Sequence, residues 1–258
     1  MPKNVDVIMP SSGRGVFITG TDTGVGKTAV TAALLAVLRQ RGVDAVPMKP
    51  VQTGCTKRAG KLVAPDLEFC LRNAGLAPAE ELCVYRFAPA SSPHLAALLA
   101  RRPIQLHKIA SAFRRLAMRH DFVLVEGAGG TLVPLGGGRT MCDLMCALAL
   151  PVVVVARPGL GTINHTLLTL AALRAARLKI AGVFFVHTQP GPLTALERDN
   201  ATTIAQLGRV AILGRLPFIA KKSDFGAAVR RFSKSWKIEP PDFPSLGKSA
   251  CAKAAADT

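Results

Sequence analysis

The residues with the clearest chemistry stand in a glycine-rich stretch, GTDTGVGKT, over residues 20–28. It follows an apolar run at 16–19 and precedes a helical pattern, which predicts a strand, a turn and a helix N-terminus in that order. Glycines let the backbone wrap an anion closely, and the free N–H groups and the helix dipole supply positive potential. Lys27 would reach the β- and γ-phosphates, and Thr28 would ligate Mg²⁺. The residues expected to line the phosphates are Gly24, Val25, Gly26, Lys27, Thr28 and Ala29. We therefore expect this loop to bind a nucleoside triphosphate.

Two further polar residues stand where apolar runs end. Lys49 ends the run at 45–49 and opens KPVQTG, and Glu126 follows the run at 122–125 and opens EGAGG. An acidic residue between a buried strand and a flexible turn is typical of a carboxylate that holds Mg²⁺ beside a phosphate-binding loop. A single lysine at such a place is more often a surface residue, and a single glutamate can be a turn or helix cap. Both alternatives stay open when each residue is considered alone.

These residues need a scaffold that alternates strands and helices. Short runs rich in Val, Ile and Phe, which predict buried strands, cover 16–19, 45–49, 122–125, 152–156, 180–186 and 210–213. Helical patterns lie between them at 27–41, 93–101, 105–119, 141–150, 164–177 and 193–207. This alternation predicts a three-layer α/β fold with a mostly parallel central sheet and helices on both faces. In such folds ligands bind beyond the carboxyl ends of the strands, where the loop, Lys49 and Glu126 are all expected.

Composition and charge restrict the class of protein. The 258 residues are 49% hydrophobic with a mean hydropathy of +0.30, which excludes a largely disordered chain. No apolar run approaches the roughly 20 residues of a membrane-spanning helix. The 33 basic and 16 acidic residues give a net charge of +17, but the basic residues are dispersed and there is one Trp and one Tyr. We therefore expect solvated basic faces rather than a nucleic-acid or membrane surface.

The six cysteines form no C-x-x-C pair and no secretory run precedes the first strand, which predicts reduced thiols and a cytoplasmic location.

Four motifs, in this order, resemble the dethiobiotin synthetase family. They are GTDTGVGKT at 20–28, KPVQTG at 49–54, VEGAGG at 125–130 and GTINH at 161–165. The six-residue step from Gly20 to Gly26, one residue longer than in the usual phosphate loop, is the spacing of that family. The resemblance covers residues 15–220 and implies one domain with a P-loop NTPase-like fold. Residues 221–258 are expected to form a basic, loosely ordered C-terminal extension.

The resemblance implies a homodimeric ligase of biotin biosynthesis that uses ATP and Mg²⁺. Its substrates would be 7,8-diaminononanoate, CO2 and ATP. The diamine and CO2 would form a carbamate, its oxygen would attack the γ-phosphorus of ATP, and the second amine would displace phosphate to close the ureido ring. A weak anionic nucleophile that approaches a polyanion needs placement and positive charge. Lys49 and Lys27, the catalytic residues by resemblance, would supply that charge from two sides.

The same resemblance assigns binding roles. Thr28, Asp66 and Glu126 would hold Mg²⁺. The nucleotide site would comprise the phosphate loop with Glu126, Gly127, Ala128, Gly129, Pro217, Phe218 and Ile219. The substrate site would comprise Thr23, Thr53, Ser92, Pro93, Thr162, Ile163 and Asn164, the last three supplied by the partner subunit at a helix N-terminus. Asp66, Ser92 and Asn164 each have a competing role as an ordinary helix cap.

The chain also departs from the family. Many members end the strand equivalent to 180–186 with an asparagine that reads the adenine edge, whereas this chain has Val186 and His187 there. We expect weaker discrimination among ATP, CTP and GTP as a result, because loss of the amide removes a hydrogen-bonding pair worth about 1 kcal/mol or more. Gly24 replaces a residue that is often acidic.

Three other classes compete with the ligase. A partition or septum-positioning ATPase shares the expected fold, but its extra loop lysine would fall at Thr21. A glutamine-dependent amidoligase needs a glutaminase domain, for which 258 residues leave no room. A structural nucleic-acid-binding protein would account for the net charge but not for Lys27, Lys49 and Glu126.

Overall fold

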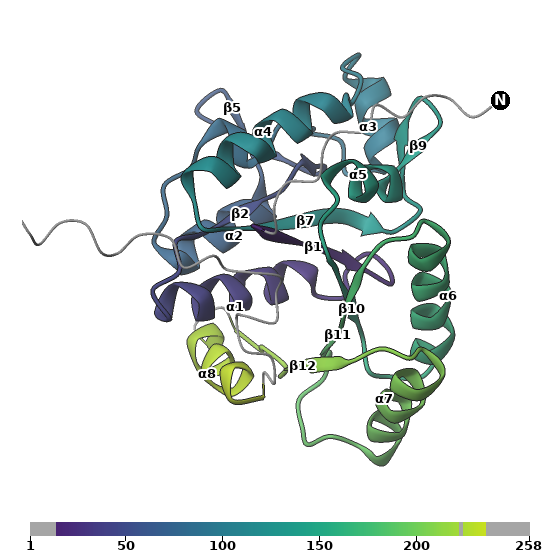
Figure 1. The fold of residues 1–258 in the computed structure, drawn as a ribbon. Coiled ribbons are helices and arrows are strands. Elements are labelled where there is room, and N and C mark those ends of the chain that lie inside the picture. The colour runs from purple at the N-terminus through teal and green to yellow at the C-terminus, as the bar shows by residue number, and fades with distance from the viewer. Residues whose placement is uncertain (1–13, 222–223, 236–258) are drawn as a thin grey trace, which may run out of the picture.

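A computed structural model describes residues 14–221 and 224–235 of the chain (Figure 1). Six strands form one parallel sheet in the order β12-β11-β10-β1-β7-β2. They are β1 (Gly15–Gly20), β2 (Ala45–Met48), β7 (Phe122–Gly130), β10 (Val152–Ala156), β11 (Ile180–Val186) and β12 (Ile212–Leu216). All six strands that the apolar runs predict are therefore present.

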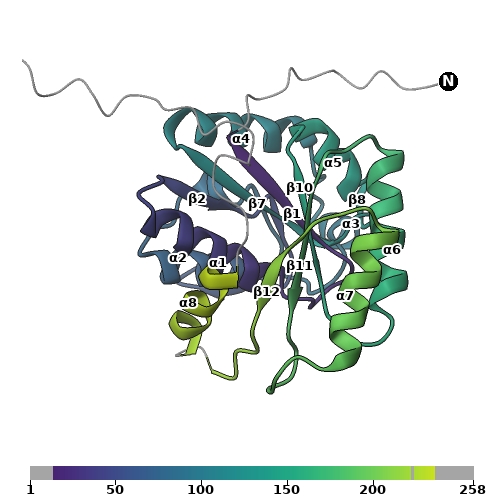
Figure 2. The same cartoon turned by 60° about the horizontal axis from the view of Figure 1, so that its bottom comes forward.

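Helices cover both faces of this sheet (Figures 1 and 2). They are α1 (Lys27–Gln40), α2 (Pro65–Ala74), α3 (Pro93–Leu99), α4 (Leu106–Arg119), α5 (Met141–Leu148), α6 (Thr162–Ala175), α7 (Ala195–Leu207) and α8 (Phe225–Ser235), with a short 3-10 helix at Glu80–Leu82. Alternate strand residues face opposite layers: Phe17 packs in the core under α4 and α5, and Val16 and Ile18 pack in the core under α1 and α8. The predicted three-layer α/β architecture is confirmed.

The segment between β2 and α3 contains structure that hydrophobic periodicity does not predict. It forms β3 (Val51–Gln52), β4 (Thr56–Arg58), β5 (Lys61–Val63), helix α2 and β6 (Tyr85–Arg86). A second hairpin of β8 (Pro134–Gly136) and β9 (Arg139–Thr140) follows β7. Strands of two or three residues are too short to show a period, so they become visible only when their partner strands are known.

The expectation of a loosely ordered segment from residue 221 is wrong for 225–235, which form α8. Phe225, Val229 and Phe232 of α8 are 3%, 3% and 0% exposed and join the same core as α1 and β12. The three residues recur at steps of four and three, so they form one apolar stripe of a helix. The basic residues between them hid this stripe in the composition of the tail. Residues 236–258 lie outside the described part of the chain.

Candidate active site

Strand register brings the predicted residues to one edge of the sheet. Met48 of β2 pairs with Val125 of β7, and Val125 pairs with Phe17 of β1. Lys49 directly follows Met48, and Glu126 directly follows Val125. Strand β1 leads into the phosphate loop. Because β7 lies between β1 and β2, the Lys49 strand is not the direct neighbour of the loop strand. Glu126 therefore stands between Lys49 and the loop.

The loop itself has the conformation that its glycines allow. Gly26, at the N-cap of α1, has a φ of 99°, and a Cβ atom there would lie 2.7 Å from Cγ1 of Val186 on β11. The ammonium of Lys27 folds back over the loop and donates a hydrogen bond to the Asp22 carbonyl at 2.8 Å. Lys27 is only 7% exposed. A buried cation above an array of turn N–H groups is suited to bind phosphate.

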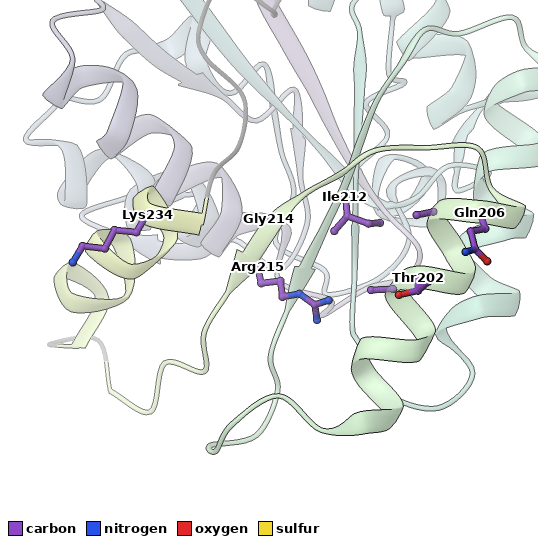
Figure 3. A pocket seen from close by; sticks show the side chains of 8 residues that line it. Thr202, Gln206, Ile212, Gly214, Arg215 and Lys234 are labelled. Carbon is purple, nitrogen blue, oxygen red and sulfur yellow. The ribbon is translucent and has the colours of Figure 1, made fainter.

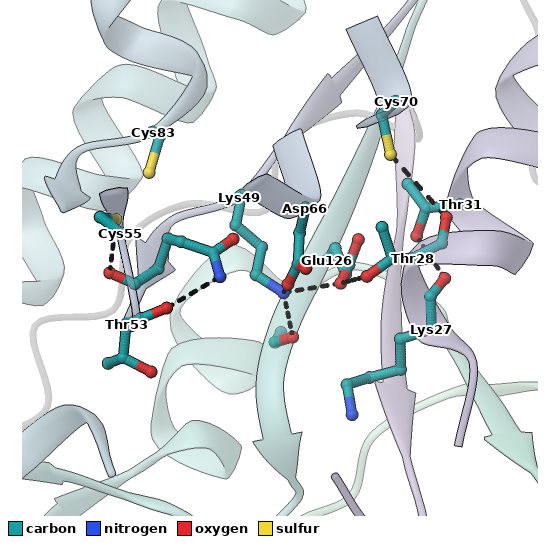
Figure 4. A network of polar contacts seen from close by, with 12 residues as sticks. Lys27, Thr28, Thr31, Lys49, Thr53, Cys55, Asp66, Cys70, Cys83 and Glu126 are labelled. Atoms are coloured by element: carbon teal, nitrogen blue, oxygen red, sulfur yellow. Dashed lines mark hydrogen bonds and ion pairs between the residues drawn. The ribbon is translucent and has the colours of Figure 1, made fainter. Parts of the chain in front are cut away.

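Glu126 is the centre of a buried polar network (Figure 4). Its Oε1 atom lies 2.6 Å from the Lys49 ammonium and accepts a hydrogen bond from the Thr28 hydroxyl at 2.8 Å. Lys49 also lies 2.8 Å from Oδ2 of Asp66 and donates to the Gly127 carbonyl at 3.2 Å. Lys49 and Glu126 are 4% and 3% exposed. The structure thus brings together four residues from separate parts of the chain: Thr28 of α1, Lys49 directly after β2, Asp66 of α2 and Glu126 of β7.

Local sequence explains how Asp66 reaches this network. Pro65 occupies the first turn of α2, where its missing N–H costs nothing, and Asp66 and Glu68 in that turn favour the helix dipole. The N-cap of α2 is Ala64, and Asp66 caps nothing. The competing interpretation of Asp66 as a plain helix cap is therefore wrong.

The two lysines have opposite electrostatic environments. Burial and the charge of Lys49 lower the pKa of Lys27 to about 8, despite the opposing carboxylates of Glu126 and Asp66. Burial also opposes the charge of Lys49, but Glu126 and Asp66 outweigh it and raise its pKa. For Asp66, burial favours the neutral acid, but the ammonium of Lys49 and hydrogen bonds from Lys49 and Gln52 lower the pKa. Lys49 is therefore held in its charged form, whereas no carboxylate within the described ranges forms an ion pair with Lys27.

The oxygen atoms around Lys49 fit a magnesium ion. No group of three or more His, Cys, Asp and Glu side chains within 14–221 and 224–235 is placed to hold a metal. Glu126, Asp66 and the Thr28 hydroxyl are instead three hard oxygen donors beside a phosphate loop, and Mg²⁺ commonly takes one or two carboxylates together with substrate phosphates. The Lys49 ammonium already lies within 2.8 Å of both carboxylates, which shows that this spot favours a cation.

The glycine-rich end of β7 runs along the phosphate loop. Gly130 pairs with Gly20, and a Cβ atom on Gly129 would lie 3.6 Å from the Thr23 hydroxyl. Gln52 was missed by sequence reasoning, although it is 7% exposed and donates a hydrogen bond to the Thr53 carbonyl at 3.0 Å. Its position inside KPVQTG between Lys49 and Thr53 was the available signal.

The predicted substrate residues Ser92, Pro93 and 162–164 lie at the N-termini of α3 and α6. Ser92 is the N-cap of α3 and Pro93 its first residue, and the Ser92 hydroxyl bonds to Nδ1 of His94 rather than to the helix backbone. Helix α6 begins at Thr162 after Gly161, so Asn164 is not its cap. The Thr162 side chain is buried against Thr166, whereas Asn164 is exposed. Pro217, Phe218 and Ile219 follow the last residue of β12.

Two cavities lie apart from the polar network. One of about 600 Å³ lies between α7 and β12 and is lined by Thr202, Ile212 and Arg215, among others (Figure 3). The other, of about 1000 Å³, is lined by β5, α2 and the segment around β6. The candidate site is therefore identified by its side-chain arrangement and not by the depth of a pocket.

No helix within the described ranges has the length and apolarity that a bilayer crossing requires.

Comparisons with known proteins agree with this geometry. Residues 14–224 match a family model described as an AAA domain. The ATP-dependent dethiobiotin synthetase BioD of Anaeromyxobacter dehalogenans strain 2CP-C is 48% identical over 209 residues, 80% of this chain and 90% of the relative. The protein of the same name from Anoxybacillus flavithermus strain WK1 is 38% identical over 211 residues, 81% of this chain and 94% of the relative.

Solved structures with low sequence identity share the fold. The MinC:MinD cell division protein complex of Aquifex aeolicus has a chain with a TM-score of 0.54 and 16% identity, over 84% of this chain and 86% of that chain. The apo McdA structure from Cyanthece has a TM-score of 0.53 and 11% identity, over 84% of this chain and 92% of that chain. The likeness confirms the predicted P-loop NTPase-like fold.

Proposed function

The chain belongs to the dethiobiotin synthetase family, and from that premise we propose how its own residues carry out the reaction. It is an ATP-dependent ligase that forms dethiobiotin in biotin biosynthesis. The observation that carries the proposal is the buried contact of Lys49 with Glu126 and Asp66 beside a loop that carries Lys27.

The proposed reaction joins 7,8-diaminononanoate, CO2 and ATP in three steps. One amine of the diamine adds to CO2, loses a proton and becomes a carbamate. A carbamate oxygen then bonds to the γ-phosphorus, and the bond to the bridging oxygen breaks to release ADP. The second amine attacks the carbonyl carbon of this mixed anhydride, loses a proton and displaces phosphate, which closes the ring.

Lys49 and Lys27 are the proposed catalytic residues because they supply positive charge at the two sides of the transferred phosphoryl group. Lys27 extends over the phosphate loop, and Lys49 directly follows β2, which β7 separates from the loop strand β1. Both side chains are buried, so solvent screens their charge weakly, and their carboxylate and backbone partners hold them in place before the substrate binds. Placement and charge of this kind are the main requirements of phosphoryl transfer.

Thr28, Asp66 and Glu126 are the residues proposed to hold Mg²⁺. When bound, the ion would neutralise phosphate charge. The same Glu126 carboxylate contacts Lys49 in the described structure, so a metal would compete with the lysine for this oxygen. Glu126 therefore links the position of Lys49 to nucleotide binding.

The diamine is proposed to bind at Thr23, Thr53, Ser92 and Pro93, with its carboxylate at 162–164 of a second copy of the chain. Asn164 is exposed at the start of α6, and Leu160, two residues before that helix, is 91% exposed. An N-terminal helix turn with free N–H groups suits a carboxylate. The homodimer is part of this proposal.

The function is tested by the dependence of ATP turnover on the diamine. Purified protein with Mg²⁺, bicarbonate and ATP should release ADP and phosphate only when 7,8-diaminononanoate is added, and mass spectrometry should detect dethiobiotin. Steady ATP hydrolysis that ignores the diamine would instead favour a switch ATPase, the class whose members share the fold. Omission of bicarbonate from degassed buffer should stop the reaction, because CO2 supplies the ring carbonyl.

A further inference from the structure

The cavity of about 1000 Å³ that β5, α2 and the segment around β6 line has a volume typical of a small-molecule site. Much of its wall is apolar, with Leu62 of β5 and Leu67 and Leu71 of α2 among the lining residues. The buried thiol of Cys83 also lines it, and burial raises the pKa of that thiol to about 12, against the opposing charge of Arg86. The thiol is therefore neutral, and the wall offers an aliphatic chain an apolar surface.

Basic side chains outnumber acidic ones around this cavity. Its charged lining residues are Lys61, Arg72, Arg86 and Arg102 against Glu68 and Glu80. Arg58, which does not line the cavity, already engages Glu68 with two hydrogen bonds of 2.6 and 3.0 Å. The remaining excess of positive charge favours an anionic ligand. Glu80 opposes a doubly charged head group such as a phosphate monoester, so the charges favour a carboxylate.

Two of the arginines stand on either side of the chain segment that closes the cavity. Arg86 follows Tyr85 on β6 and is partly buried. The guanidinium carbon of Arg102 lies 5.0 Å from the centroid of the Tyr85 ring, and the same group donates a hydrogen bond to the Val84 carbonyl at 3.2 Å. No carboxylate within 14–221 and 224–235 forms an ion pair with either guanidinium. Since a guanidinium binds a carboxylate through two parallel hydrogen bonds, both arginines suit the charged end of a ligand.

Helix α2 separates this cavity from the polar network of the candidate active site. Leu67 and Leu71 are four residues apart, so they share the face of the helix that lines the cavity. Asp66 and Cys70, also four residues apart, share another face, where Asp66 contacts Lys49 at 2.8 Å. Cys70 packs in the core under α1, whereas the two leucines pack in the other core. The cavity is therefore distinct from the site that contains Lys49.

We propose that this cavity binds an aliphatic chain that ends in a carboxylate. The carboxylate pairs with Arg86 and Arg102, and the chain lies against the leucines of β5 and α2. Two sources supply such a ligand: a medium-chain fatty acid, and the product of the proposed reaction, which keeps the carboxylate chain of the diamine. Only the second source rests on the proposed function, because the cavity and its charges do not depend on it.

The test is calorimetric titration of the whole protein with nonanoate, without ATP. Nonanoate should bind at one site per chain. Nonylammonium has the same chain and the opposite charge, so it should bind at least about tenfold more weakly. Titration with dethiobiotin separates the two sources. Tighter binding of dethiobiotin than of nonanoate assigns the site to the product, and weaker binding assigns it to a fatty acid.

Two variants locate the binding. Arg86→Gln removes one guanidinium and should weaken nonanoate binding by about tenfold or more. Ala79→Trp places a large side chain at an exposed lining residue, so it should abolish binding without a change in the core. Ala77→Trp, exposed in the same segment but outside the cavity lining, is the matched control and should bind nonanoate like the wild type. Circular dichroism and the affinity for ADP with Mg²⁺ should stay unchanged in all three variants.

Three results would overturn the inference. They are no nonanoate binding by the wild type, equal affinities for nonanoate and nonylammonium, and a wild-type affinity for nonanoate in either Arg86→Gln or Ala79→Trp. Binding that persists in these variants would place the ligand elsewhere, for example in the proposed diamine site. Failure of the protein to form dethiobiotin would instead count against the proposed ligase and leave this site intact, because nonanoate binding is measured without turnover.

Discussion

Lys49 and Lys27 differ in what balances their charge. Lys49 is buried between two carboxylates, and such an arrangement is strongly destabilised when one partner is removed, because the others remain as uncompensated buried charges. Lys27 is also buried, but its ammonium bonds to a backbone carbonyl. One lysine is thus fully paired in the described structure, whereas the other needs an anion such as phosphate to complete its surroundings.

Replacement of Lys49 tests its catalytic role. Lys49→Gln should lower kcat by about two to three orders of magnitude, because a preorganised cation is lost at the place where charge develops. Nucleotide affinity should change less, since the loop and Lys27 remain. The measurement is steady-state ADP release, with circular dichroism to confirm folding. Lys57→Gln, at an exposed lysine of β4, should have a wild-type rate, and a near-normal rate in Lys49→Gln would exclude Lys49 from the mechanism.

The lowered pKa of Lys27 predicts linked proton uptake. Its folded pKa of about 8 lies below the ordinary lysine value of 10.5, so between these values the folded protein holds fewer protons than the unfolded chain. Its unfavourable contribution to stability is therefore full below pH 8 and is relieved as the pH rises. Phosphate should raise this pKa again, so binding of ADP in EDTA should take up a proton near pH 9 and weaken as the pH increases.

Calorimetry in two buffers of different ionisation enthalpy measures this uptake. Near pH 9 the binding enthalpies in the two buffers should differ by about the difference between the two buffer ionisation enthalpies, which corresponds to uptake of about one proton. Near pH 6.5 the two binding enthalpies should agree. Identical enthalpies in both buffers at the higher pH would show that Lys27 stays charged in the free protein.

At the scale of elements, Gly26 joins the phosphate loop to β11. Gly26→Ala would force alanine into a φ of 99° and place its Cβ 2.7 Å from Val186, so it combines backbone strain of about 1–2 kcal/mol with overpacking of about 1–3 kcal/mol. Gly42→Ala is the matched control, since its φ is 81° but no atom lies within 4 Å of the new Cβ. Urea unfolding should show a larger decrease in the free energy of unfolding for Gly26→Ala than for Gly42→Ala. Equal decreases would mean that the Val186 side chain moves aside at no energetic cost.

Helix α8 provides a second prediction at this scale. Phe232 is fully buried, so Phe232→Ala should lower the free energy of unfolding by about 3–5 kcal/mol. Met118→Ala, at a side chain that is 73% exposed on α4, should change the free energy of unfolding much less. Equilibrium unfolding in urea measures both changes. If Phe232→Ala proved as mild as the control, α8 would not be part of the core.

The sequence predicts those elements whose residues repeat over several turns or form one uninterrupted apolar run. The six sheet strands and the glycine-rich loop meet this condition. Helix α2 does not, because only Leu67, Cys70 and Leu71 of its ten residues are buried. The site shows the same division. Lys49 and Glu126 follow predictable strands, but the contact of Asp66 with Lys49 depends on a hairpin and a helix that periodicity does not reveal.

At the scale of the whole molecule, the net charge of +17 is spread over many local arrangements. Arg115 and Arg119 of α4 both pair with Glu81, and Arg58 pairs with Glu68. Exposed pairs of this kind add little stability, about 0–1 kcal/mol each. They do, however, keep these arginines engaged with the protein's own carboxylates. The arrangement agrees with solvated basic faces.

Exposed apolar side chains are the whole-molecule feature relevant to the proposed dimer. Leu160 is 91% exposed directly before the turn that starts α6, and Leu168 on the same helix is 61% exposed. Leu98 and Leu99 at the end of α3, the helix that Ser92 caps, are 71% and 62% exposed. Exposed large apolar side chains on the elements that carry proposed diamine-binding residues favour contact with a second copy of the chain.

Leu160→Asp tests this contact together with its role in the site. An aspartate beside the start of α6 should oppose an apolar interface and repel the substrate carboxylate, so sedimentation should show monomers and the KM for the diamine should rise by about tenfold or more. ADP affinity should stay unchanged, because the phosphate loop lies within one chain. Met118→Asp, at a side chain that is 73% exposed on α4, should leave both sedimentation and KM as in the wild type. A monomeric wild-type protein with full activity would show that one chain completes the site by itself, and residues 162–164 would then have no partner to serve.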